Sequence, residues 1–175
     1  MKLQRRTLVM AGVAAAAGGA GALVATRRFQ LQPVMSEAEV AFWAGEFEGP
    51  NGQQLRMADF RGQPLLVNFW ATWCPPCVEE LPMLNRFHEV QAAKGWKVLG
   101  LAVDQPSAVR SFLVKLPLNF PVGMAGFAGT ELSRSLGNPS GALPFTVVFG
   151  ADGALLHRKM GKVSDADLAQ WAELA

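Results

Sequence analysis

Residues 65–77 read Leu65-Leu66-Val67-Asn68-Phe69-Trp70-Ala71-Thr72-Trp73-Cys74-Pro75-Pro76-Cys77. The first six form an apolar run with one polar member, which is typical of a β-strand covered on both faces. The only two cysteines of the 175-residue chain come next, and Leu81, Leu84 and Phe87, at a spacing of three, predict that a helix follows them. A Cys-x-x-Cys pair at such a strand-to-helix junction is suited to thiol–disulfide exchange.

Cys74 is the predicted nucleophile of this pair. Only a thiolate attacks a disulfide, and the unpaired N–H groups and the dipole of a helix N-terminus stabilise negative charge there. Cys77 is the predicted resolving thiol, because three residues along a helix bring its sulfur next to that of Cys74. Pro75 and Pro76 fit the first helical turn, where N–H groups lack helical partners. The alternative, an inert structural disulfide, would gain little because the closed loop is so short.

The segments after the motif predict an α/β fold. Lys97–Val103 is a second buried strand, and the helix between the two strands implies a parallel, right-handed connection. The remaining predicted elements are helices at Ser107–Leu116, Thr130–Leu136 and Ser164–Leu174, and strands at Phe120–Val122, Phe145–Phe149 and Ala154–Met160. Gly150-Ala151-Asp152-Gly153 predicts an antiparallel hairpin between the last two strands. Together these elements predict a three-layer α/β/α sandwich around a central mixed sheet.

The segments before the motif predict an N-terminal β-hairpin extension. Ala41–Phe47 and Gln54–Met57 flank Glu48-Gly49-Pro50-Asn51-Gly52, which is strong turn chemistry. Ser36 and Glu39 have the spacing of a capping box and so predict the start of a short helix. A polar surface stretch is the alternative for these two residues. Neither internal repeats nor a second domain are indicated.

Residues 1–26 predict an export signal or an N-terminal membrane anchor. A basic segment ending in Arg5-Arg6 precedes the uncharged stretch Thr7–Thr26. Twenty uncharged residues are just enough to span a bilayer. Ala20-Gly21-Ala22, in contrast, offers a small-residue cleavage site, and the arginine pair also resembles a twin-arginine signal. Uncleaved anchor, Sec signal and Tat signal therefore stay open.

All three possibilities place the protein on the oxidising side of a bacterial inner membrane, in the periplasm. The chain would be tethered through residues 7–26, or soluble after cleavage. Residues 27–36 form the predicted spacer, and residues 37–175 form the predicted domain. This domain has 11 basic residues against 14 acidic ones, because five of the sixteen basic residues precede residue 29. A nucleic-acid-binding function is therefore not expected.

Beyond the cysteines, the stretch from Val67 to Cys77 resembles the thioredoxin superfamily. With Glu80, Pro82 and the segment Ala142-Leu143-Pro144-Phe145-Thr146, it is similar more narrowly to the membrane-tethered TlpA/ResA-type thiol–disulfide oxidoreductases of bacteria. The resemblance covers about residues 40–175 and implies a thioredoxin-like fold. It also implies that Pro144 is a cis-proline packed against the active-site sulfurs. The backbone of Leu143 would then pair with an extended client segment.

The same resemblance implies roles for residues around the cysteines. Trp73, with Pro75 and Pro76, would form part of the client-binding surface. Glu80 would be a partly buried carboxylate that manages the thiol protons; the alternative is that Glu79 and Glu80 are two solvated acids in the first helical turns. Asn68 departs from ordinary thioredoxin, which has a carboxylate at this position as proton acceptor. Glu80 or water would therefore have to take the proton.

Three functions are compatible with these observations. The resemblance favours an exported enzyme that reduces disulfides of client proteins, of the type matured in cytochrome c or cytochrome oxidase assembly. A membrane-embedded thiol carrier would supply its electrons. The same chemistry run backward would make a disulfide oxidase, and thiolates also suit a Cu(I)-binding chaperone. No cofactor or resident metal is expected beyond the redox-active pair Cys74–Cys77, and the clients are expected to be proteins with disulfides.

Overall fold

A computed structural model describes residues 35–174 of the chain. The predicted export signal or anchor at residues 1–26, and all but the last two residues of the predicted spacer, lie outside this described part. Within residues 35–174, no helix combines the length and the apolar character needed to cross a membrane.

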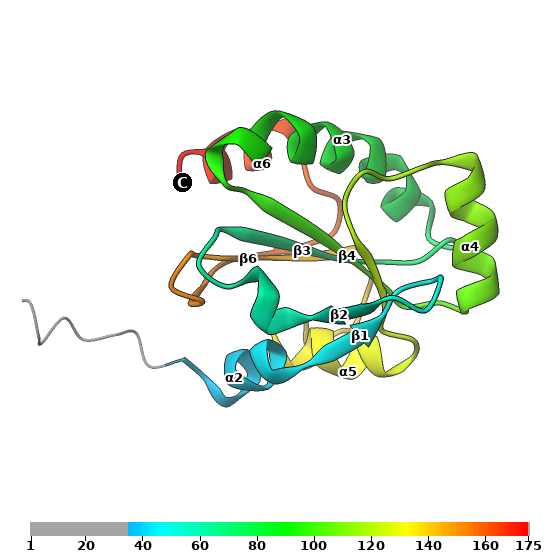
Figure 1. The fold of residues 1–175 in the computed structure, drawn as a ribbon, viewed down its shortest axis with the longest axis horizontal. Coiled ribbons are helices and arrows are strands. Elements are labelled where there is room, and N and C mark those ends of the chain that lie inside the picture. Colours follow the sequence, from blue (N-terminus) through cyan, green and yellow to red (C-terminus); the bar gives the residue numbers. More distant parts are fainter. Residues whose placement is uncertain (1–34, 175) are drawn as a thin grey trace, which may run out of the picture. The chain divides into compact units, whose positions relative to one another are not determined.

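A seven-stranded mixed sheet forms the middle layer of the domain (Figure 1). Its strands are β1 (Glu46–Glu48), β2 (Gln54–Arg56), β3 (Leu65–Trp70), β4 (Lys97–Ala102), β5 (Val122–Met124), β6 (Phe145–Phe149) and β7 (Leu155–Met160). In space they follow the order β2-β1-β5-β4-β3-β6-β7. Strands β3, β4 and β5 are parallel, and all other pairs are antiparallel. The motif-bearing strand β3 therefore lies inside the sheet, hydrogen-bonded on both sides.

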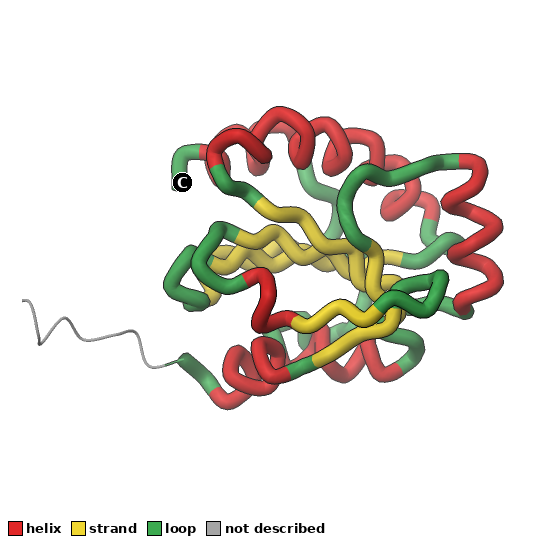
Figure 2. Tube along the Cα trace, in the orientation of Figure 1, coloured by secondary structure: helices red, strands yellow, loops and turns green. Residues whose placement is uncertain are grey.

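Helices cover both faces of this sheet (Figures 1 and 2). They are α2 (Glu37–Ala44), α3 (Pro75–Gln91), α4 (Pro106–Lys115), α5 (Ala128–Ser135) and α6 (Asp165–Ala172), with short 3₁₀ turns at Met57–Phe60 and Ala92–Lys94. Helices α3, α4 and α6 pack on one face, and α2 and α5 on the other. The predicted three-layer sandwich is confirmed.

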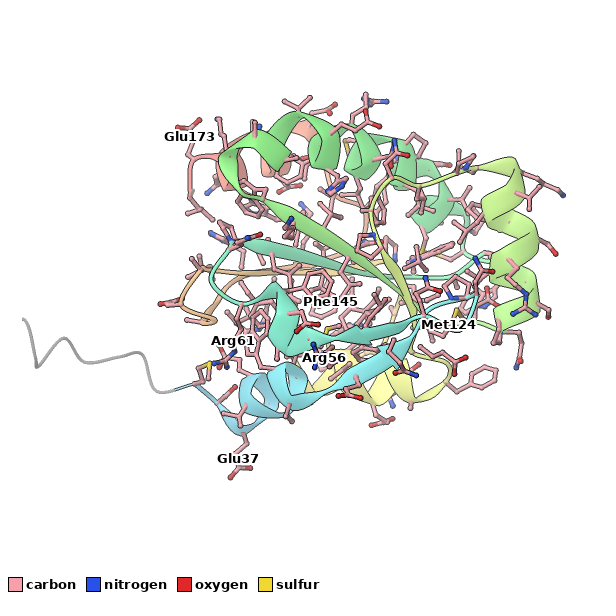
Figure 3. The ribbon with its side chains drawn as sticks, in the orientation of Figure 1. Glu37, Arg56, Arg61, Met124, Phe145 and Glu173 are labelled. Carbon is pink, nitrogen blue, oxygen red and sulfur yellow. A yellow bond between two sulfur atoms is a disulfide. The ribbon has the colours of Figure 1, made fainter. Side chains whose placement is uncertain are left out.

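Side chains of β3 alternate between two separate cores, as the twofold period of a strand requires. Leu66 and Trp70 lie in the core under α3 and α6, whereas Leu65, Val67 and Phe69 lie in the core over α2 and α5. Figure 3 shows the side chains that fill these layers, including Phe145 in the second core. Asn68 is the one polar residue on β3, and the alternation directs it toward α3.

The elements before β3 largely follow the sequence-based predictions. The Ser36–Glu39 capping box is present, and it begins α2. Strands β1 and β2 form the predicted hairpin, but residues 41–44 belong to α2 rather than to its first arm. The hairpin joins the central sheet through the pairing of Glu48 with Met124. This part of the chain therefore extends the sheet at one edge.

Strand β5 begins two residues later than the sequence pattern predicted. Phe120 packs into the core beside α3 and α4, and Pro121 has no N–H to donate to a neighbouring strand. Only the Pro121 carbonyl takes part in the ladder, accepting from the Gly100 N–H at 3.0 Å. The regular strand therefore begins at Val122.

Candidate active site

The two cysteines lie at the N-terminus of α3, joined by a disulfide. Cys74 is the N-cap residue of this helix, and Pro75 and Pro76 occupy its first two positions. Both sulfur-bearing residues are buried, while the two prolines between them are exposed. The prolines supply no N–H groups to the space around the Cys74 sulfur.

Trp73 and the Leu143–Pro144 segment are the other predicted client-binding residues. Trp73 directly precedes Cys74, and its side chain is 64 % exposed. Pro144 is buried and Leu143 half-buried, and the peptide bond between them is cis. The Pro144 carbonyl accepts from the Gly161 N–H at 2.9 Å, so the segment after β7 is fixed to the residue that precedes β6. An exposed tryptophan and two exposed prolines thus adjoin the buried cysteines in the chain.

Glu80 lies one helical turn beyond Cys77, and its side chain is fully buried at 0 % exposure. Its two carboxylate oxygens have different donors. Oε1 accepts from Asn68 Nδ2 on β3 at 2.7 Å, and Oε2 accepts from the backbone N–H of Val163 at 2.7 Å. Glu79 behaves as the solvated acid of the alternative interpretation, since it is exposed and pairs with Lys162 at 2.7 Å. The two neighbouring glutamates therefore occupy opposite environments.

Burial raises the pKa of Glu80 from its ordinary 4.5 to about 7, because the interior disfavours the charged carboxylate. The hydrogen bonds from Val163 and Asn68 and the positive charge of Lys162 favour the charged form, but they offset the cost of burial only in part. A carboxyl group with a pKa near 7 can both accept and return a proton at neutral pH. That property is what a group managing the protons of a dithiol requires.

Asp104 holds the strand-to-helix turn in which Thr72 and Trp73 lie. This buried residue follows β4, and its Oδ2 accepts from the Thr72 backbone N–H at 2.8 Å and from the Thr72 hydroxyl at 2.7 Å. Its other oxygen accepts from the Gln105 N–H at 2.7 Å. One side chain thus links the ends of two neighbouring parallel strands, directly before the cysteines.

The structure brings together residues that the sequence analysis did not connect. Thr146 lies opposite Asn68 in the β3–β6 register and accepts from Asn68 Nδ2 at 3.0 Å. Val163 comes from the segment after β7, 83 residues from Glu80. Thr146 was part of the quoted motif, and its pairing with Asn68 follows once β3 and β6 are aligned. No pattern in the sequence pointed to Val163 or Asp104.

Comparison with known proteins agrees with this geometry. The Redoxin family profile matches residues 38–172, which is most of the chain. The protein belongs to the Redoxin family. Among curated proteins, the thiol-disulfide oxidoreductase ResA of Bacillus thuringiensis is 29% identical over 121 residues, covering 69% of this chain and 68% of that protein. The predicted resemblance to ResA-type oxidoreductases of the thioredoxin superfamily is confirmed.

This Redoxin-family chain is also similar in fold to solved structures. A thiol:disulfide interchange protein of the thioredoxin family from Chlorobium tepidum has a TM-score of 0.65 at 29% identity, covering 75% of this chain and 92% of that one. A secreted thiol-disulfide isomerase from Corynebacterium glutamicum has a TM-score of 0.65 at 27% identity, covering 74% and 81%. The fold is thioredoxin-like, and the protein is a thiol–disulfide oxidoreductase.

Proposed function

We propose that this Redoxin-family protein is an exported reductase that passes two electrons from Cys74 and Cys77 to disulfides of client proteins. The observation that supports it most directly is the placement of Glu80, a buried carboxyl group with a pKa of about 7, one turn from a buried Cys77. Cys77 must lose its proton before it can attack, and a thiol that solvent does not reach needs a base inside the protein.

The reaction proceeds in two exchanges. The Cys74 thiolate attacks one sulfur of the client disulfide, which forms a mixed disulfide and releases the first client sulfur as a thiolate that takes a proton from water. Glu80 then accepts the proton of Cys77. The Cys77 thiolate attacks the Cys74 sulfur, closes the Cys74–Cys77 disulfide and releases the second client thiolate. The client gains two electrons, and the protein is left oxidised with a protonated Glu80.

The two prolines support the reducing direction. A dithiol oxidises strongly when its reduced form is stabilised, as in the most oxidising members of this fold. Pro75 and Pro76 occupy the first turn of α3 and have no N–H to offer the Cys74 thiolate. The thiolate is therefore less stabilised than it would be with two N–H donors, which favours a low reduction potential.

Export to the periplasm and re-reduction by a membrane thiol carrier are also part of the proposal. Residues 1–26 have the composition of a signal or anchor, and one structural relative is described as secreted. Because the periplasm is kept oxidising, a reductase there needs a dedicated electron donor. In cells, a thiol reagent that cannot cross the inner membrane should label reduced Cys74. Labelling only after cell lysis would contradict export.

The deciding measurement is the reduction potential of the pair in the full-length chain in detergent. Thiol trapping in graded redox buffers would report the transition as a mass shift, with Cys77→Ser as the control that cannot form the disulfide. A potential well below about −200 mV is expected for a reductase, whereas a value near −120 mV would make the protein an oxidase. Absence of a reversible transition would mean that the pair is structural or metal-binding.

A further inference from the structure

The side-chain amide of Asn68 is paired at one end only. The residue is 0 % exposed, and its Nδ2 donates to Glu80 Oε1 at 2.7 Å and to Thr146 Oγ1 at 3.0 Å. Both N–H bonds of the amide are therefore used. Its Oδ1 has no hydrogen-bond partner within residues 35–174. Buried polar atoms are nearly always paired, so an unpaired oxygen in the middle of the sheet needs an explanation.

Two groups donate hydrogen bonds to Glu80, the Val163 backbone N–H and the Asn68 side-chain amide. They differ in whether they can also accept one. The Val163 N–H belongs to the backbone and can only donate, so Oε2 must remain an acceptor in either protonation state. The Val163 N–H cannot accept a proton from Oε2, whereas a proton on Oε1 faces the amide of Asn68, which can present either a donor or an acceptor. Two donors cannot share a hydrogen bond, so a proton on Oε1 that points at Asn68 conflicts with the present orientation of the amide.

We propose that Asn68 is a positioning residue whose amide turns over when Glu80 takes up a proton. A rotation of about 180° about the Cβ–Cγ bond exchanges Oδ1 and Nδ2 without moving the backbone, because the amide end is nearly symmetric in shape. Oδ1 then accepts from the Glu80 O–H and from the Thr146 O–H. The hydrogen bonds to Glu80 and Thr146 remain, each with its direction reversed, and the two N–H bonds move to the place that Oδ1 now occupies without a partner. The turn breaks no hydrogen bond at that end, and the new bond to the Glu80 proton has to offset the cost of leaving the N–H groups there.

Asparagine is suited to this task because it pairs with both states of Glu80. An aspartate at position 68 would repel the ionised glutamate, and a leucine would leave Glu80 Oε1 without a partner in either state. The inference rests on the proposed role of Glu80 as proton acceptor, and it adds how that proton is held. With the amide free to turn, taking up and returning the proton need not break the contacts of α3 with β3.

Few charged groups surround this network. Lys162, in the segment after β7, is the one whose charge acts on Glu80, and it is itself paired with Glu79 on the outer side of α3. Strands β3 and β6 contribute the neutral Asn68 and Thr146. From α6, the nearest acid by position is Asp165, at the exposed start of that helix. Glu80 is therefore the group in contact with the Asn68 amide whose charge changes on titration.

The test is nuclear magnetic resonance of the full-length oxidised protein in detergent, with asparagine labelled at its side-chain nitrogen. The Asn68 amide signals are expected to shift between pH 5 and pH 9, with the midpoint of the Glu80 carboxyl carbon signal. Cross-peaks from the Nδ2 hydrogens to Thr146 should be lost at the acid end. Asn138 is the internal control, since it is also buried and donates to Ser133 Oγ and to the Ala142 carbonyl. Its signals should stay constant.

The variant Glu80→Gln provides a fixed reference. Its amide oxygen must face the Val163 N–H, so its NH₂ group must face Asn68 and demands the turned amide at every pH. The Asn68 signals of this variant should match the acid limit of the wild type throughout. Asn68 signals that ignore the Glu80 titration, with the Thr146 cross-peaks kept at both ends, would overturn the inference. That result would leave the proposed proton role standing, which fails separately if Glu80→Gln leaves exchange rates unchanged.

Discussion

Glu39 and Glu80 are both carboxylates withdrawn from solvent, yet the protein shifts their pKa values in opposite directions. Burial acts to raise the pKa of both. At Glu39 the donors outweigh burial: Ser36 donates through its hydroxyl and its N–H, Leu155 donates at 2.6 Å, and Arg158 adds a positive charge. The net pKa of Glu39 is lowered. At Glu80, two donors and Lys162 leave burial dominant, and the pKa rises to about 7.

The difference shows what separates a structural carboxylate from one that can exchange protons. Glu39 caps α2 and ties that helix to β7, and a proton would weaken every contact it makes. Glu80 has fewer donors, and one of them is a side chain that can turn over. Full burial combined with incomplete pairing is therefore a better indicator of a proton-exchanging group than burial alone.

The largest expected effect is on the rate of disulfide closure, which should depend on Glu80 and not on Glu39. Glu80→Gln should slow the closure of the Cys74–Cys77 disulfide from a mixed disulfide by about 10²–10⁴-fold above pH 7, the usual contribution of a general base. In the wild type this rate should rise through about pH 7, as Glu80 ionises. Glu39→Gln should leave the rate unchanged. Stopped-flow measurement of disulfide closure across pH 5–9 tests this. Equal closure rates for Glu80→Gln and Glu39→Gln would contradict a catalytic difference between the two glutamates.

The second expected effect is on stability against pH. The pKa of Glu80 is higher in the folded protein than its ordinary 4.5, so its ionisation costs no stability below pH 4.5 and costs most above about pH 7. The unfolding free energy of Glu80→Gln, relative to wild type, should therefore rise by roughly 3 kcal/mol between pH 4.5 and pH 8. Urea titrations of the oxidised proteins measure this difference.

Glu39 should show the opposite sign. Its pKa is lowered by folding, so its stabilisation is present above pH 4.5 and is lost as the pH falls through the lowered value. Glu39→Gln should therefore be less stable than wild type at pH 7, and the deficit should shrink in acid. If the unfolding free energies of Glu39→Gln and Glu80→Gln, each relative to wild type, changed with pH in the same direction, the opposite pKa shifts of the two glutamates would be contradicted.

The smallest expected effect concerns the Ser36 hydroxyl, which donates a hydrogen bond to Glu39. Ser36→Ala removes the hydroxyl that caps α2 and donates to Glu39, so it should cost about 1 kcal/mol and raise the pKa of Glu39. Ser164→Ala removes the matching cap of α6 and should cost a similar amount without affecting Glu39. Carboxyl carbon titration and thermal unfolding of both variants would test it, and an unmoved Glu39 pKa in Ser36→Ala would contradict it.

Local patterns in the sequence were enough to predict the parallel connection of β3 to β4, the β6–β7 hairpin, the helices after the motif and the cap at Ser36. They did not predict that β3 pairs with β6. The apolar run of β3 and the Cys-x-x-Cys pair identify their own neighbourhood because strand, turn and helix are continuous there. The proton network could be predicted only at its centre. Asn68 and Glu80 lie 12 residues apart, but Thr146 and Val163 come from 78 and 83 residues away. Their positions depend on sheet register and on the course of the chain after β7, which no local pattern records.

The contacts of α2 also show where this helix lies relative to the disulfide. Trp43 Nε1 donates to the Gly153 carbonyl at 2.8 Å, which fixes this helix to the turn between β6 and β7. That turn lies beside the start of β3, because Phe149 pairs with Leu65, whereas the disulfide follows the end of β3. The six residues of β3 separate these two ends by about 20 Å. Helix α2 and the disulfide therefore lie toward opposite ends of β3, so a client that bound at the disulfide would approach the end of the domain away from α2.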